Sequence, residues 1–139
     1  MAKQTNLYLT AELNNPAVTI VPADTTALKT LYTASANDAV VKSLMCVSDD
    51  TAAVNLRVLL TVSGTDYQIG TVNIPIASGT NGTANAIDVL NAISLPGLPI
   101  DRNGKRVLPL KTGVILKVAA LATVTAAKTV TISACVEEY

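Results

Sequence analysis

The residue types that most often carry out acid–base chemistry are scarce in this sequence. The chain of 139 residues has no His, and its adjacent carboxylates are the pairs Asp49-Asp50 and Glu137-Glu138. General acid–base catalysis normally needs His or a carboxyl group with a shifted pKa. Neighbouring side chains on an extended chain point in opposite directions, so neither pair converges on one substrate atom. We therefore expect no catalytic residue, no small-molecule substrate and no enzyme, with a small hydrolase as the least favoured function.

The two cysteines, Cys46 and Cys135, lack the partners of a catalytic thiol. A nucleophilic thiol needs an activating base, and the sequence offers no His for that role. Cys46 lies in an apolar segment and is typical of a small core residue, whereas Cys135 alternates with inward positions. The first six residues, MAKQTN, lack the apolar stretch of a signal peptide, which favours cytoplasmic synthesis and free thiols. A Cys46–Cys135 disulfide remains an alternative if their strands are adjacent.

Metal, cofactor and phosphate sites are not expected either. Zinc sites draw on clusters of Cys and His, and this chain has only two separated Cys. A calcium site is a weak alternative, because Asp49, Asp50 and Asp66 would meet if their turns lay at one end of the domain. The glycines match neither a P-loop nor a dinucleotide-binding spacing, and we interpret them as turn residues.

The charge balance argues against nucleic-acid and membrane partners. Ten basic and ten acidic residues cancel, whereas nucleic-acid binding draws most of its affinity from a positive surface. Arg102, Lys105 and Arg106 form one short basic cluster, which we interpret as solvated loop charge. No apolar run is long enough to span a membrane.

Apolar and β-branched residues recur in segments of about six to ten residues, separated by short turn-forming clusters, which predicts strands. Alternation is clearest in residues 54–62, where Leu56, Val58, Leu60 and Val62 share the predicted buried face. A change of apolar phase at Gly70 predicts a β-bulge, and Asn103-Gly104 predicts a hairpin turn. The other predicted strands are residues 26–33, with Leu28 and Leu31 buried, and residues 40–48, 67–76, 114–121 and 129–136. In residues 67–76, Val72, Ile74 and Ile76 are in phase, and in residues 114–121 one face carries Val114, Leu116, Val118 and Ala120. Residues 129–136 place Val130, Ile132, Ala134 and Val136 inward and Thr129, Thr131, Ser133 and Cys135 outward.

These elements predict an all-β fold, an antiparallel β-sandwich of jelly-roll type with an extended N-terminal arm. Residues 1–22 are predicted to be this arm or an edge strand, because Pro16 interrupts their strand pattern. Residues 23–139 are predicted to form the β-sandwich domain. Residues 86–93 fit either a short helix or a strand, and the structure of residues 86–100 stays open.

The apolar surface predicts self-association. Mean hydropathy is +0.43, and Leu59, Ile115 and Leu121 fall on strand faces that point away from the predicted core. Large exposed apolar patches usually mark interfaces. The alternative is that a helix or loop of the same chain covers them. The predicted interface residues, from the arm and the C-terminus, are Leu7, Tyr8, Leu9, Val18, Ile20 and Tyr139.

Several turn and strand segments together resemble small virion structural proteins of tailed bacteriophages and prophages. The resemblance covers roughly residues 30–139, and its motifs are structural rather than catalytic. The segments are residues 31–38 (LYTASAND), 47–53 (VSDDTAA), 64–72 (GTDYQIGTV), 79–83 (GTNGT), 95–101 (LPGLPID), 116–118 (LKV), 126–130 (AAKTV) and 137–139 (EEY).

The resemblance implies a capsid decoration, or cement, protein that binds the outer shell of the phage head. Its implied partners are further copies of itself, with a trimer favoured, and the phage major capsid protein. Its implied location is the capsid surface of the virion, after synthesis in the cytoplasm of the bacterial host. The alternative within the same class is a tail, head–tail joining or host-binding virion protein.

Overall fold

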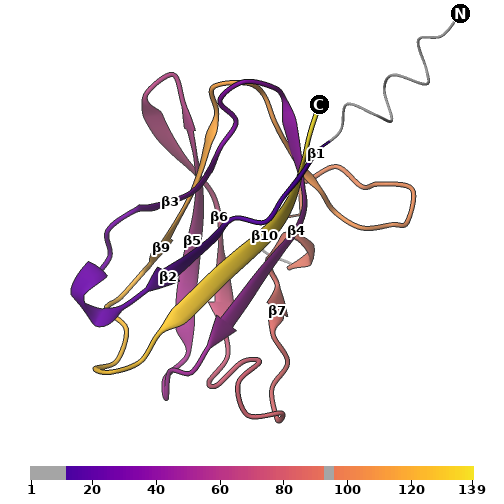
Figure 1. The fold of residues 1–139 in the computed structure, drawn as a ribbon. Coiled ribbons are helices and arrows are strands. Elements are labelled where there is room, and N and C mark those ends of the chain that lie inside the picture. Colours follow the sequence, from indigo (N-terminus) through magenta and orange to yellow (C-terminus); the bar gives the residue numbers. More distant parts are fainter. Residues whose placement is uncertain (1–11, 93–95) are drawn as a thin grey trace, which may run out of the picture.

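The structure is a computed structural model that describes residues 12–92 and 96–139, and ten β-strands hold about half of these residues (Figure 1). The strands are β1 (Glu12–Asn14), β2 (Ala17–Ile20), β3 (Lys29–Thr33), β4 (Ala39–Ser48), β5 (Val54–Val62), β6 (Thr65–Ile74), β7 (Ile87–Asp88), β8 (Leu108–Leu110), β9 (Ile115–Ala120) and β10 (Val130–Glu138). Two single-turn 3₁₀ helices, η1 (Pro22–Asp24) and η2 (Val89–Asn91), complete the regular elements of these residues. The prediction of an all-β chain is confirmed.

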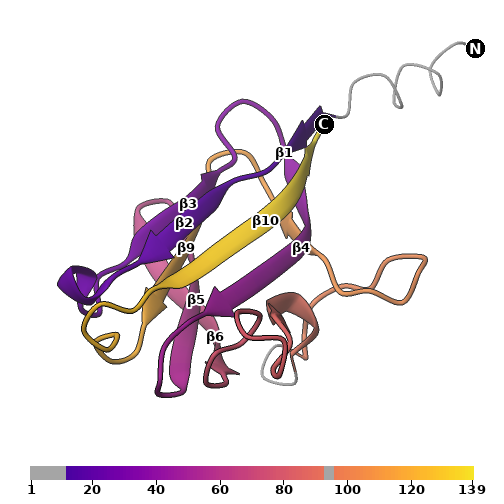
Figure 2. The ribbon, with the colours of Figure 1, turned by 60° about the horizontal axis from the view of Figure 1, so that its bottom comes forward.

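The strands form two antiparallel sheets. The six-stranded sheet has β10 and β4 at its centre, with β1 and β2 pairing on one side of β10 and β7 and β8 on the far side of β4. The four-stranded sheet has the order β3-β9-β5-β6. In both ribbon views the β2-β10-β4 layer lies in front of the β3-β9-β5-β6 layer (Figures 1 and 2).

The core lies between these two sheets and is almost wholly aliphatic. Strand β10 shows why, because Val130, Ile132 and Val136 are fully buried while Thr131 and Ser133 between them face outward. The same alternation places Leu56 and Val58 of β5, and Leu116 and Val118 of β9, in the core. These predicted inward faces are confirmed, and they follow from the two-residue repeat of a strand.

The first described residues of the chain form edge strands. Strands β1 and β2 lie end to end along β10, and the gap between them falls at Asn15 and Pro16. Proline has no N–H to donate, but the Pro16 carbonyl accepts a hydrogen bond of 3.0 Å from the Ala134 N–H. Residues 12–20 therefore follow the edge-strand alternative, while the first half of the predicted arm, residues 1–11, lies outside the described residues.

The predicted bulge at Gly70 is confirmed. Val58 of β5 lies opposite Gly70, but the next residue, Leu59, lies opposite Gln68, so Ile69 is the extra residue on β6. An extra residue shifts the side-chain alternation by one place, which explains the change of apolar phase in the sequence. The bulge lets Ile69 pack against the core alongside Val72 and Ile74.

Residues 86–93, for which the sequence fitted either a short helix or a strand, contain a short piece of each. Ile87 and Asp88 form the two-residue strand β7, and η2 follows directly with Val89 and Leu90 fully buried. Residues 93–95 lie outside the described residues. Further along, the predicted hairpin turn is present, since Ile100 and Arg106 form an isolated bridge around it.

Some predicted positions were wrong. Val62 is 41% exposed and Ile76 is 55% exposed, because both lie at or beyond the end of their strand. Leu28 is 36% exposed, since it precedes β3 rather than lying in it. Leu59 was predicted to face solvent and is 3% exposed.

Leu59 is buried because long polar neighbours cover it. Its partners across the sheet are Gln68 and Lys117. Gln68 accepts a hydrogen bond of 2.9 Å from Arg57 Nε, and Lys117 Nζ lies 3.2 Å from Asp66 Oδ1. The aliphatic stems of such side chains can shield an apolar residue while their polar ends stay in water. Part of the apolar surface that was predicted to be exposed is therefore covered by other side chains of the same chain.

Candidate functional site

The predicted interface residues are divided between the core, the surface and the undescribed N-terminus. Leu7, Tyr8 and Leu9 lie outside the described residues. Val18 is half-buried against the core, and Tyr139 is 49% exposed, with its hydroxyl donating to Glu137 Oε2 at 2.8 Å. One of the interface residues predicted from the sequence, Ile20, does not lie on the surface. Ile20 is fully buried in the core of its own chain, so its side chain has no surface to offer a partner.

Both cysteines are free thiols on adjacent strands, but they point to opposite faces of the sheet. Cys46 of β4 lies opposite Ile132 of β10, and Cys135 of β10 lies opposite Ser43 of β4. Cys46 is fully buried in the core, and this burial raises the pKa of its thiol to about 12. Cys135 is half-buried on the outer face of the sheet. The prediction of free thiols is confirmed, and strand adjacency does not bring the two sulfurs together.

The adjacent carboxylates are each committed to a structural partner. Asp49 Oδ1 accepts a hydrogen bond of 2.7 Å from the Thr129 N–H, while Asp50 bonds different backbone groups. Glu138 accepts a hydrogen bond from the Tyr32 hydroxyl, and Glu137 Oε2 lies 3.9 Å from Lys42 Nζ. Each pair therefore connects separate parts of the fold rather than one reaction centre.

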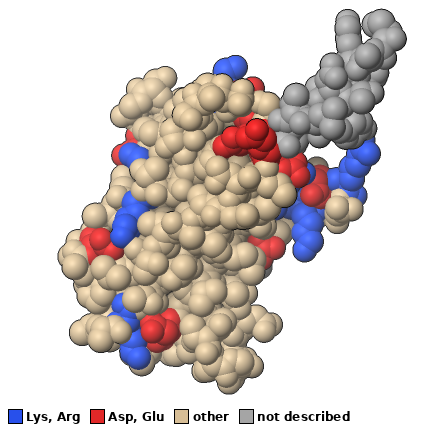
Figure 3. Space-filling view, viewed as in Figure 1, with Lys and Arg blue, Asp and Glu red and all other residues tan. Residues whose placement is uncertain are grey.

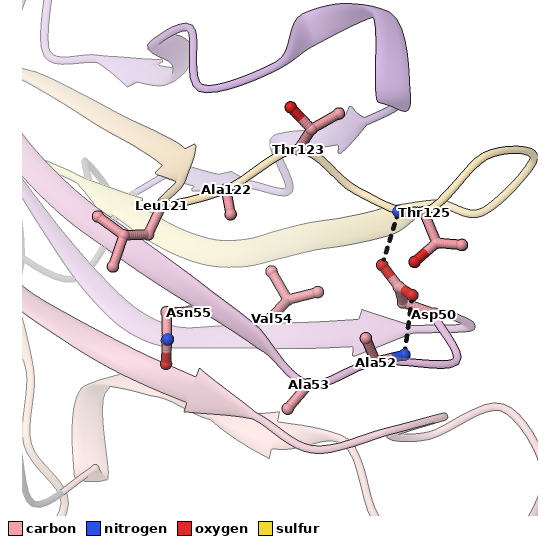
Figure 4. Close-up of a pocket in the computed structure, with 9 residues that line it drawn as sticks. All are labelled: Asp50, Ala52, Ala53, Val54, Asn55, Leu121, Ala122, Thr123 and Thr125. Atoms are coloured by element: carbon pink, nitrogen blue, oxygen red, sulfur yellow. Dashed lines mark hydrogen bonds between the residues drawn. The ribbon is translucent and has the colours of Figure 1, made fainter.

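Asp50 borders a pocket of about 200 Å³ between the turn after β4 and the loop after β9 (Figure 4). Its side chain is almost fully buried. Oδ1 accepts a hydrogen bond of 2.9 Å from the Ala52 N–H, and Oδ2 accepts one of 3.0 Å from the Thr125 N–H. Burial acts to raise the pKa of Asp50, but hydrogen bonds from Thr125, Ala52 and Thr51 outweigh it and hold the pKa below its ordinary value.

The geometry of this pocket indicates a structural role for Asp50. Its carboxylate fastens two loops together, and the rest of the wall is made largely of small apolar side chains such as Ala53, Val54 and Ala122. Ligand pockets usually measure about 300–1,000 Å³, so this space is small even for a compact ligand.

A wider and shallower depression of about 660 Å³ lies between strands β5 and β6 and residues 86–92. Its polar groups include Asn55 and Asn73, which bond each other at 3.1 Å, and Asp88. Asp88 Oδ2 accepts a hydrogen bond of 2.8 Å from Asn91 Nδ2, and its Oδ1 is buried without a partner in the described part of the chain. Asp88 is the one titratable residue among those that line this depression.

The weak calcium alternative was wrong for a geometric reason. Asp50 precedes the start of β5 and Asp66 follows its end, so the nine-residue strand separates them. Asp66 instead accepts hydrogen bonds from the Thr61 hydroxyl and Lys117 Nζ, which lower its pKa. Within residues 12–92 and 96–139, no group of three or more His, Cys, Asp or Glu side chains is placed to hold a metal ion. No helix there is both long enough and apolar enough to cross a membrane.

The feature that stands out is the outer face of the six-stranded sheet. Its central rows carry no charged side chain on β2, β10 and β4, and Asp88 of β7 lies directly opposite Met45 at the end of one row. One row is Ala17, Ser133 and Met45, and the next is Thr19, Thr131 and Val47. We call this surface the uncharged face. It comprises Ala17, Thr19, Ser43, Met45, Val47, Thr131, Ser133 and Cys135.

Charged side chains surround the uncharged face rather than lying on it. Figure 3 views the molecule from this side and shows Lys, Arg, Asp and Glu around the margin of an uncharged centre. The Lys42–Glu137 pair lies toward the C-terminal end of β10, and the Lys29–Asp24 pair lies beside β2, where Lys29 Nζ also bonds the Thr19 carbonyl. The face is also nearly smooth, since Ser133 and Ala17 at its centre are small and exposed.

Only one of the three strands that form the uncharged face had its outward residues predicted from the sequence. The outward positions of residues 129–136 were predicted correctly, because their alternation is local. The rows contributed by β2 and β4 were missed, because no local pattern shows that Ala17 lies beside Ser133. Protein-family models and curated proteins were compared with this sequence, and none of either matches it.

Proposed function

We propose that this chain is a structural protein of a tailed-phage virion, and in particular a capsid decoration protein. It binds the outside of the shell and stabilises the head through contacts with further copies of itself and with the major capsid protein. The observation that carries the proposal is the contrast between the charged side chains that bond within the fold and the uncharged face. Asp49, Asp50 and Glu137 are bonded within the fold, whereas the uncharged face stands open.

The order of the strands supports a jelly-roll sandwich. If β2 to β10 are counted as eight successive strands, with β7 and β8 sharing the sixth place, the sheets read 1-8-3-6 and 2-7-4-5. That interleaved order is what two nested Greek keys produce, and jelly rolls recur in viral capsid proteins. A fold alone does not assign a function, so the proposal also draws on the resemblance of residues 30–139 to small virion proteins.

The physics of a decorated shell fits a protein of this kind. A molecule that binds only the assembled state stabilises that state by mass action. A contact that is weak between two copies gains strength when many copies sit on one lattice. Such a protein needs a rigid scaffold and complementary surfaces, and it needs no catalytic group. A trimer on the capsid surface is the arrangement we favour.

The proposal is tested by locating the chain in virus particles. An affinity-tagged copy is expressed in the bacterial strain whose genome encodes it, particles are induced and purified, and gold-labelled antibody against the tag is imaged. We expect label spread over the heads in many copies. Label confined to tails or to one vertex would replace the decoration role with the tail or head–tail alternative, and unlabelled particles would overturn the virion proposal.

A further inference from the structure

We propose that Asn81 is a site of spontaneous chemical modification, at which the fold promotes conversion of the side-chain amide to a carboxylate. Asn is a chemically labile residue type. The sequence holds two Asn-Gly pairs, Asn81-Gly82 and Asn103-Gly104, and all four residues are exposed. The structure assigns the faster reaction to Asn81. The inference concerns the chain itself and does not depend on the proposed function.

The reaction consumes only water and joins the Asn81 side chain to the backbone that follows it. The Gly82 backbone nitrogen gives its proton to hydroxide, and its electron pair forms a bond to Asn81 Cγ, so that negative charge moves onto Oδ1. As the carbonyl re-forms, the Cγ–Nδ2 bond breaks and Nδ2 takes a proton from water and leaves as ammonia. The product is a five-membered succinimide ring. Water then opens this ring, and cleavage of the new N–Cγ bond gives Asp, whereas cleavage of the original peptide bond gives isoaspartate.

The two Asn-Gly pairs are matched in the access that they give to the attacking nitrogen. Glycine has no Cβ to crowd the approach. Gly82 and Gly104 share a left-handed backbone, with φ +78° and +77°, and a Cβ built at either would meet nothing within 4 Å. The pairs therefore differ in their hydrogen bonds rather than in their openness.

The first difference lies at the nitrogen that must lose its proton. The Gly104 N–H donates to the Asp101 carbonyl at 3.1 Å. The Asp101 carboxylate also lies close, since its Oδ1 accepts hydrogen bonds from the N–H groups of Asn103 at 2.9 Å and Lys105 at 3.0 Å. A negative nitrogen at Gly104 would face an acceptor oxygen and a like charge, which disfavours loss of the proton. The Gly82 N–H has no acceptor in the part of the chain that the structure describes, so it carries no such penalty.

The second difference lies at the oxygen that gains negative charge. Asn81 Oδ1 accepts a hydrogen bond of 2.9 Å from the Thr83 N–H. This donor stands where charge develops when the nitrogen attacks Cγ, so it stabilises the tetrahedral intermediate as an oxyanion hole does. It also holds the side chain turned toward the residues that follow it. The Asn103 side-chain oxygen accepts no hydrogen bond from the described residues, so its reaction lacks this assistance.

The arrangement at Asn81 is held in place from both sides of the turn. The Gly79 N–H donates to the Ala84 carbonyl at 2.7 Å, and Thr80 Oγ1 donates to the Ser48 carbonyl at 3.3 Å. These bonds fix the ends of the loop and leave its exposed tip, residues 81–83, to react. The formal net charge of the chain is zero, so each conversion makes the molecule acidic by one charge.

The test follows both Asn-Gly pairs in the same molecules. The full chain is incubated in mildly alkaline buffer, once in its native state and once in concentrated urea, where neither pair keeps its hydrogen bonds. Samples are digested at acidic pH, where the reaction is slow, and mass spectrometry measures the fraction of each peptide that has exchanged its amide for a carboxylate. The urea arm gives the rate that each pair has without the fold.

We expect the ratio of the Asn81 rate to the Asn103 rate to be at least about 10-fold larger in the native protein than in urea, because a hydrogen bond to a developing charge has about that effect. Isoelectric focusing of the intact native chain should show one more acidic species that grows at the Asn81 rate. A ratio that is the same in both arms, or smaller in the native protein, would overturn the inference.

A pair of variants tests the Thr83 N–H itself. Thr83→Pro removes this donor, and Lys105→Pro is the matched control because it places proline at the same distance after Asn103. Circular dichroism checks that each variant is folded. We expect Thr83→Pro to slow the native Asn81 reaction about 10-fold and Lys105→Pro to leave the Asn103 reaction no slower. An undiminished Asn81 rate in folded Thr83→Pro would overturn the part assigned to Thr83, and if that variant does not fold, the comparison of native and urea arms on the unaltered chain decides.

Discussion

The Tyr32 hydroxyl donates a hydrogen bond to the Glu138 carboxylate, joining β3 at the edge of one sheet to the last residue of β10 in the other. The two residues are 106 positions apart in sequence. Tyr32 is buried beneath this contact, and its burial, followed by the bond to Glu138, raises its pKa to about 12. The contact therefore closes one end of the space between the sheets and makes that closure sensitive to alkaline pH.

The first prediction concerns this pH dependence. The folded pKa of Tyr32 lies above its unfolded value of about 10, so its stabilising contribution is complete below pH 10. That contribution is lost as the pH rises through 10 toward 12. In Tyr32→Phe this part of the alkaline loss should vanish, which urea titrations between pH 8 and pH 12 would measure. An alkaline absorbance titration should show a late phase to which Tyr32 contributes, and an unchanged late phase in Tyr32→Phe would contradict the assignment.

The second prediction concerns Asp50. Replacing it with Ala leaves the Ala52 and Thr125 N–H groups without their acceptor, and we expect a loss of about 3 kcal/mol in the free energy of unfolding. Because the folded pKa of Asp50 is lowered, its contribution is present above the unfolded pKa and disappears as the pH falls through the folded value. Urea unfolding at pH 7 and near pH 3 would test both statements.

The control for Asp50 is the residue beside it. Asp49 is exposed and accepts one backbone hydrogen bond, from Thr129, so Asp49→Ala should cost clearly less than Asp50→Ala. Equal losses in the two variants would show that the turn, rather than the buried carboxylate, carries the stability.

The third prediction is a difference between the two thiols. Cys46 is buried and its pKa is raised to about 12, so very little thiolate is present near neutral pH. A coloured thiol reagent added to dilute native protein at pH 8 should therefore react first with Cys135, and with Cys46 only as the protein unfolds. Cys135→Ala should remove the fast phase and Cys46→Ala the slow one. A fast reaction of Cys46 in the native state would show that the core around β4 opens readily.

Local alternation explains what could be predicted from the sequence. Residues 54–62 and 130–136 repeat every two positions, and this repeat alone identifies a strand and its buried face. The extra residue at Ile69 was equally visible, because a bulge shifts that repeat. In each case the information lies within one strand.

Contacts between distant strands could not be predicted in the same way. The burial of Leu59 depends on Gln68 and Lys117, which reach it from two other strands. The uncharged face needs the pairing of β2 with β10, which places Ala17 beside Ser133. Ile20 illustrates the reverse error, because an apolar residue in an N-terminal segment was assigned to an interface while the fold placed it in the core. A single sequence does not determine such registers.

The last prediction compares two glycines that share a left-handed backbone. Gly64 has φ +80° and Gly79 has φ +76°, so Ala at either position adopts an unfavourable conformation at a cost of about 1 kcal/mol. A Cβ on Gly64 would meet nothing within 4 Å, whereas one on Gly79 would lie 3.1 Å from Ala86 Cβ and 3.2 Å from Val47 Cγ2. We expect Gly79→Ala to be the more destabilising by at least about 1 kcal/mol, because the loop must move away from β4. Urea unfolding of the two variants measures the difference, and equal losses would mean that this loop yields without cost and does not hold the edge of the uncharged face at Val47.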